Sequence, residues 1–175
     1  WGKKRIENFG YTGLHLSVQP SENTDYPDDF FDYVIFVDIL HHVDIPATLK
    51  ETVRILKPGG MIIGNELYSH SFLEQKVRNS WFVRNILYKL LRDFVYRDKI
   101  IYITPDEHKI DETEFSYISD VCTELDREYF YILSTRLFPD SIVWATKLDR
   151  FLCKRLMGAS KYLAARVAFE GKIKK

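Results

Sequence analysis

The stretch that decides the fold runs from Tyr26 to Glu66 and reads YPDDFFDYVIFVDILHHVDIPATLKETVRILKPGGMIIGNE. Within it, residues 33–37 form an unbroken apolar run, mostly β-branched or aromatic, which is typical of a parallel strand covered on both faces. We therefore expect a central strand of a sheet at this position.

A helix and a second strand follow this run. Asp44 and Pro46 suit the start of a helix, and apolar residues recur at helical spacing as far as Lys57. The turn at residues 58–60 ends the helix, and residues 61–65 have the pattern of the next strand. Strand, helix and strand within about thirty residues predict a right-handed βαβ unit, and hence an α/β fold.

The flanking segments complete one globular domain over residues 1–175. A short strand is expected at residues 14–18, where Pro20 ends it because proline donates no hydrogen bond to a sheet. An aromatic stretch of helical pattern predicts helical structure at residues 68–103. Beyond it the patterns predict a helix within residues 107–125, a strand at 129–137, a helix at 141–156 and a strand at 166–173. The helix at 141–156 is expected to turn four apolar side chains inward, those of Leu148, Phe151, Leu152 and Leu156.

Composition narrows the class of protein. The 25 Lys and Arg balance the 25 Asp and Glu, so no nucleic-acid partner is expected, although residues 67–175 are net basic. Only two cysteines are present, at Cys122 and Cys153, which fits a reducing compartment, and we expect a cytoplasmic location. Since the chain begins at Trp1 within a helix-like pattern, we also expect upstream sequence.

Three signals in one register resemble a known family. Residues 26–34 are similar to the lead into the fourth strand of class I S-adenosylmethionine-dependent methyltransferases, residues 39–43 to the segment after that strand, and residues 54–60 to the turn into the fifth. The resemblance implies a Rossmann-like, mostly parallel sheet flanked by helices, with a cap after the fifth strand. It also implies S-adenosylmethionine as the cofactor and a small-molecule acceptor.

The resemblance also assigns candidate site residues, because open α/β sheets bind ligands beyond the carboxyl ends of their strands. It places Ser21 and Glu22 beside the adenine, and Val37 and Asp38 beside the methionine part of the cofactor. The loop after the fifth strand would face the acceptor and supplies three candidate substrate contacts, Glu66, Tyr68 and His70. Asp38 has a second interpretation as a cap of the following turn.

The chain departs from the family pattern in its first part. The glycine-rich loop of the family and the acidic residue that holds the ribose hydroxyls have no counterpart here, since Gly2, Gly10 and Gly13 lack the required spacing. Pro20 stands where many relatives carry an acidic residue near the adenine. We therefore expect the amino-terminal part of the fold to be missing from this sequence.

His41 and His42 follow the predicted central strand. No third ligand stands at metal spacing, so no metal site is predicted. For His42 we expect a structural role at the turn. For His41 the alternative is a general base that takes a proton from the acceptor. No side-chain base is strictly required, however, because holding two reactants in line can itself accelerate methyl transfer.

The stretch from Phe72 to Tyr102 interleaves aromatic and basic residues. Its default interpretation is a packed lid helix, and the alternative is contact with a membrane surface or an apolar, lipid-like acceptor. The leading hypothesis is methyl transfer to a small molecule. The rivals are a non-catalytic domain that acts as a binding partner or scaffold and, less favoured, a nicotinamide-dependent oxidoreductase. The sequence does not specify an oligomeric state.

Overall fold

The computed structural model describes residues 10, 12–68, 76, 80–82, 85–86, 110–134, 138 and 141–175. Four strands form its sheet, namely β1 (Phe31–Val37), β2 (Leu56–Leu67), β3 (Cys122–Phe130) and β4 (Arg166–Ile173), in the order β1-β2-β4-β3. β1 is parallel to β2, whereas β4 is antiparallel to both β2 and β3. Three strands therefore run in one direction and β4 in the other, which confirms the α/β, Rossmann-like sheet.

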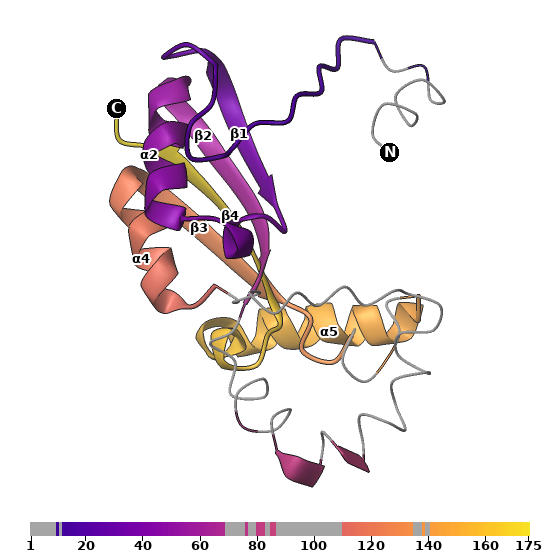
Figure 1. The fold of residues 1–175 in the computed structure, drawn as a ribbon. Coiled ribbons are helices and arrows are strands. Elements are labelled where there is room, and N and C mark those ends of the chain that lie inside the picture. Colours follow the sequence, from indigo (N-terminus) through magenta and orange to yellow (C-terminus); the bar gives the residue numbers. More distant parts are fainter. Residues whose placement is uncertain are drawn as a thin grey trace.

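Two helices cover one face of this sheet (Figure 1). Helix α2 (Ile45–Ile55) begins at the N-cap Asp44, whose carboxylate accepts a hydrogen bond from the Ala47 amide. Helix α4 (Glu112–Val121) begins with a capping box, in which Asp111 and Glu114 satisfy each other's backbone amides. The main core lies between these helices and the sheet, and it includes Leu40, Leu49, Ile62, Phe115, Ile118, Val167 and Phe169.

The opposite face of β1 is open. Tyr33, Ile35 and Val37 alternate with the inward-facing Val34 and Phe36, and the side chain of Ile35 is 64% exposed. β1 is also an edge strand of the described sheet rather than the expected central one. The predicted strand at residues 14–18 is wrong, because this segment is irregular and exposed and pairs with no described strand.

Two later predictions also need correction. The strand expected at residues 129–137 lies earlier, as β3, where it pairs with β4 from Cys122 to Phe130. Helix α5 (Val143–Leu156) was expected to turn Leu148 and Phe151 inward, but both side chains are exposed. The predicted strand at 166–173 is confirmed as β4.

The segment between β2 and α4 leaves and re-enters the core at one point. Tyr68 and Ile110 form an isolated parallel bridge, and both side chains are fully buried. The Ile110 amide donates to the Leu67 carbonyl at 3.1 Å, and the Tyr68 amide donates to Ala165 at 2.9 Å. Most of the predicted cap at 68–103 lies outside the described residues, so the cap stays a prediction.

Two lysines after β4 hold the ends of the helices. The ammonium group of Lys174 donates to the carbonyls of Ser119 and Asp120 at the end of α4. The ammonium group of Lys175 donates to three carbonyls at the end of α2, those of Val53, Arg54 and Leu56. Both contacts place a cation where the helix dipole is negative. Among the described helices, none has the length and apolar character needed to cross a bilayer.

Candidate functional site

The candidate site begins where the backbone leaves β1. Asp38 has a φ of 51°, a left-handed conformation that few residues other than glycine adopt and that aspartate tolerates better than most. Its amide donates to the Asn65 carbonyl of β2 at 3.1 Å. The chain then turns into the short 3-10 helix η1 (Leu40–His42). The turn leaves the Asp38 side chain 47% exposed at the carboxyl end of the sheet.

Arg166, at the start of β4, holds the Asp38 carboxylate from the side. Its Nη2 atom lies 2.5 Å from Asp38 Oδ1 and 2.9 Å from Asn65 Oδ1, and its Nε donates to the same Asn65 oxygen at 3.1 Å. The Arg166 side chain is only 17% exposed. Three strands therefore contribute to one charge-assisted network beside the open face of β1.

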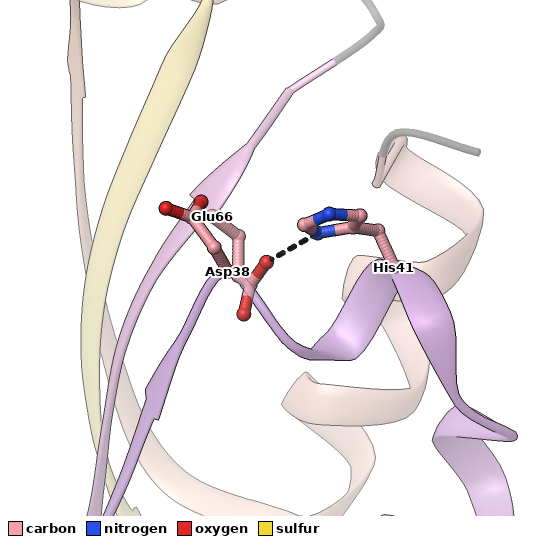
Figure 2. Close-up of side chains that lie close together, drawn as sticks. All are labelled: Asp38, His41 and Glu66. Atoms are coloured by element: carbon pink, nitrogen blue, oxygen red, sulfur yellow. Dashed lines mark hydrogen bonds and ion pairs between the residues drawn. The ribbon is translucent and has the colours of Figure 1, made fainter. Parts of the chain in front are cut away.

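His41 and Glu66 form a buried pair next to this network. His41 Nδ1 lies 2.9 Å from Glu66 Oε2, and the two side chains are 3% and 0% exposed. The other carboxylate oxygen, Oε1, accepts the amides of Ile39 at 2.9 Å and Leu40 at 3.1 Å. Figure 2 shows the imidazole ring facing the carboxylate, with Asp38 alongside. Glu66 thus fixes both the turn after β1 and the plane of the His41 ring.

Asp38, His41 and Glu66 each offer one ligand atom within 4.8 Å of the others. Their existing partners make the set unsuitable for a cation. Arg166 already places a positive charge on Asp38, and both oxygens of Glu66 are occupied by His41 and the two amides. A metal ion would have to displace these contacts, so the donor set does not favour a cation.

Ser21 and Glu22 lie apart from this network, at the amino-terminal end of α2. Glu22 Oε1 accepts the Asp44 amide at 3.2 Å, and its Oε2 accepts the Ser21 hydroxyl at the same distance. The Ser21 hydroxyl also lies 3.2 Å from the Thr48 hydroxyl. Both side chains are half-buried. The loop is therefore fixed against α2, where a carboxylate is favoured by the helix dipole.

The structure places two of the three predicted substrate contacts in the core, and the third lies outside the described residues. Glu66 is completely buried, and its contacts make it a support for His41 rather than a group that touches a ligand. Tyr68 is also buried, and its hydroxyl bonds the Glu112 carboxylate of α4. Burial, together with this carboxylate, raises the pKa of Tyr68 well above its ordinary value. His70 lies outside the described residues.

Sequence reasoning missed Arg166 and Asn65. Asn65 precedes Glu66 at the end of a recognisable strand, so its position beside Asp38 follows once the parallel pairing of β1 and β2 is assumed. Arg166 carried no such signal, because its contact with Asp38 depends on β4 lying antiparallel to β2 across 101 residues of sequence. By contrast, Val37 and Asp38 lie at the strand end where they were predicted.

Comparisons with known proteins point to methyltransferases. Residues 2–64 match a family model described as a methyltransferase domain. A ubiquinone/menaquinone biosynthesis C-methyltransferase UbiE from Geotalea daltonii is 35% identical over 74 residues, which make up 41% of this chain and 32% of the relative. The corresponding protein of Rickettsia massiliae is 39% identical over 62 residues. The matched part spans 32% of the length of the first relative and 25% of the second, so the chain covers about a quarter to a third of them.

Solved structures show a similar fold over nearly the whole chain. A possible histamine N-methyltransferase from Thermotoga maritima has a TM-score of 0.54 at 17% identity, covering 98% of this chain and 70% of the other. A geranyl diphosphate C-methyltransferase from Streptomyces coelicolor has a TM-score of 0.52 at 11% identity, covering 99% and 60%. The curated relatives are named as enzymes, and they lend no support to a non-catalytic domain.

Proposed function

Since the chain has the fold of class I S-adenosylmethionine-dependent methyltransferases, and its residues 2–64 carry the sequence of a methyltransferase domain, we propose that it transfers a methyl group from S-adenosylmethionine to a small apolar acceptor. The observation that carries the proposal is the strained turn at Asp38. A left-handed non-glycine residue at the carboxyl end of a parallel strand, held from two other strands, is the kind of backbone strain that is found at ligand sites.

The residues at this turn fit the methionine part of the cofactor. Half of the Asp38 side chain is exposed, and its carboxylate is an acceptor for an ammonium group. Val37 offers an exposed apolar surface next to it. Ser21 and Glu22 stay candidates for the adenine side, although their present contacts are with α2. When bound, S-adenosylmethionine supplies an electrophilic methyl group on a sulfonium sulfur.

We assign the acceptor to a ring compound with an isoprenoid-like apolar part, and the atom methylated to carbon. The support is the UbiE relatives, which are named as C-methyltransferases of ubiquinone and menaquinone biosynthesis. The new carbon–carbon bond forms as the carbon–sulfur bond breaks, with its electron pair left on sulfur. The acceptor carbon then loses a proton, and His41 Nε2 is the assigned proton acceptor because Nδ1 faces Glu66.

Isothermal titration of the folded, full-length protein with S-adenosylmethionine tests the cofactor assignment. The native chain is expected to bind, and D38A to bind about tenfold or more weakly, since it loses a charge-assisted contact. D126A is the matched control, because Asp126 is an exposed aspartate on β3. Absence of heat with the native chain would overturn the proposal.

Turnover with a demethylated polyprenyl quinone precursor tests the acceptor and the base. H41Q is expected to lower kcat by a factor of about 100 or more while leaving cofactor affinity unchanged. Unchanged kcat would make His41 structural. Methylation of histamine but not of the quinone precursor would reject the acceptor class while keeping the cofactor.

A further inference from the structure

Helix α5 turns a line of large apolar side chains outward. Trp144, Leu148 and Phe151 are spaced so that they share one side of the helix, and Trp144 and Phe151 are 57% and 62% exposed. The next element, the 3-10 helix η4 (Met157–Tyr162), continues this surface with the half-exposed Tyr162. Exposed aromatic residues in a row are uncommon on a protein surface that meets only water.

A row of cations borders this apolar line. Lys147, Arg150 and Lys154 follow at spacings of three and four residues, and all three are exposed, as is Arg155. Asp149 is the only acidic residue of α5, and it points inward. Its carboxylate accepts the backbone amides of residues 132–134 at 2.8, 3.0 and 3.2 Å. Every exposed charge on α5 is therefore positive.

The same contacts give the helix a defined orientation. Asp149 ties α5 to the segment that follows β3, and Ala145 is buried beside it, so the opposite side of the helix must face away from the core. Figure 1 shows α5 lying across the end of the sheet where β3 ends and β4 begins. The Asp38–Arg166 network lies at this same end, because Arg166 is the first residue of β4.

From this arrangement we propose that the outer surface of α5 and η4, formed by Trp144, Lys147, Leu148, Arg150, Phe151, Lys154, Arg155 and Tyr162, docks on an anionic lipid membrane. Trp and Tyr settle at the level of lipid headgroups, and Lys and Arg pair with anionic phosphates there. The apolar line would enter the acyl boundary while the cations stay among the headgroups. This inference stands apart from methyl transfer, although it would bring the candidate site close to a lipid-like acceptor.

Charge argues for a membrane rather than for a second copy of the chain. A two-fold symmetric contact through this surface would bring the cations of one copy against the same cations of the other. An anionic membrane neutralises them instead. The segment from residue 131 to 165 carries six Lys or Arg against two Asp, so its net charge is positive.

Co-sedimentation of the full-length protein with phosphatidylcholine vesicles, with and without phosphatidylglycerol, tests the proposal. The native protein is expected to bind only the anionic vesicles, with a blue shift of its tryptophan emission. The double variants W144S/F151S and K147E/R150E should each weaken this binding by about tenfold or more. Y117S and K50E are the matched controls, because Tyr117 on α4 and Lys50 on α2 are exposed elsewhere.

Three results would overturn the proposal. The first is that the native protein and both double variants bind anionic vesicles equally well. The second is that the native protein forms concentration-dependent dimers that W144S/F151S abolishes. The third is that the protein binds duplex DNA or RNA and does not bind vesicles. Titration with S-adenosylmethionine is expected to give the same heat for the double variants as for the native chain. A failure of the membrane proposal is thereby distinguished from a failure of the proposed enzymatic function.

Discussion

At the scale of single residues, Arg166 sets the orientation of the Asp38 carboxylate at the candidate site. Aspartate in a left-handed conformation costs free energy that its surroundings must supply, and here the Asn65 carbonyl and the Arg166 guanidinium hold it in place. The guanidinium also occupies one carboxylate oxygen, Oδ1. The direction in which Asp38 presents its remaining oxygen is therefore set by a residue 128 positions away in the sequence.

Replacing Arg166 is expected to weaken cofactor binding without unfolding the protein. R166A should lower affinity for S-adenosylmethionine about tenfold, and R166K should restore only part of it, because lysine cannot bond Asp38 and Asn65 in the same planar geometry. Titration calorimetry gives the affinities, and circular dichroism shows whether the fold persists. Equal affinities for all three proteins would mean that Arg166 does not position Asp38.

Glu66 is expected to matter for stability rather than for ligand contact. In E66Q one acceptor oxygen becomes an NH₂ donor. If it faces the amides of Ile39 and Leu40 they lose their acceptor, and if it faces His41 the ring must carry its proton on Nε2 in place of Nδ1. We expect a loss of about 1–3 kcal/mol in unfolding free energy by urea denaturation. E170Q, at an exposed glutamate of β4, is the control and should change little.

At the scale of elements, α2 is the best-anchored helix of the candidate site. Its buried Glu51 accepts two hydrogen bonds from Arg54, at 2.7 and 2.8 Å, and two from Thr24 in the loop that precedes β1. Arg54 also bonds Asp28 at 2.7 Å. Hydrogen bonds from Arg54, followed by those from Thr24, lower the pKa of Glu51 to about 2 despite its burial.

This low pKa predicts an acid-sensitive anchor. Because the folded-state pKa of Glu51 lies below its ordinary value of 4.5, the unfolded chain binds the proton more readily, and the stabilisation is present above about pH 4.5 and lost as the pH falls toward 2. Unfolding free energy should therefore drop more steeply between pH 5 and pH 3 in the native protein than in E51Q. Parallel pH profiles would show that the Glu51 contacts contribute nothing.

Elements were predictable where one local signal was sufficient. The apolar run of β1, the cap and proline of α2 and the alternating pattern of β4 each specify their own structure. β3 was misplaced because residues 122–130 lack an alternating apolar pattern, with charged side chains at Glu124 and at 126–128, and the strand is defined by its pairing with β4. The orientation of α5 was misjudged because its apolar residues lie on two sides, and only the contacts of Asp149 decide which side is buried.

At the scale of the whole molecule, the described sheet is covered on one face only. Helices α2 and α4 bury Phe36 and its neighbours, while Tyr33, Ile35 and Val37 remain open on the other face and β1 has a free edge. A free edge joined to an exposed apolar face is a template for further pairing.

A polypeptide of these 175 residues is therefore expected to self-associate through β1. I35K should reduce the association, since a lysine on the open face adds charge at the edge without disturbing Phe36 beneath it. Light scattering over a range of concentrations measures the effect, and Y117K on α4 is the control. Association that is insensitive to I35K would place the contact elsewhere.

The bridge between Tyr68 and Ile110 has a consequence for protein engineering. The two ends of the segment from residue 69 to 109 meet at a buried, hydrogen-bonded point, and the entropy cost of closing such a segment grows only with the logarithm of its length. We therefore expect that a segment of another length, taken from a relative, can replace residues 69–109 while the sheet and the Asp38 network stay intact. Such chimaeras would test whether this segment governs which acceptor is methylated.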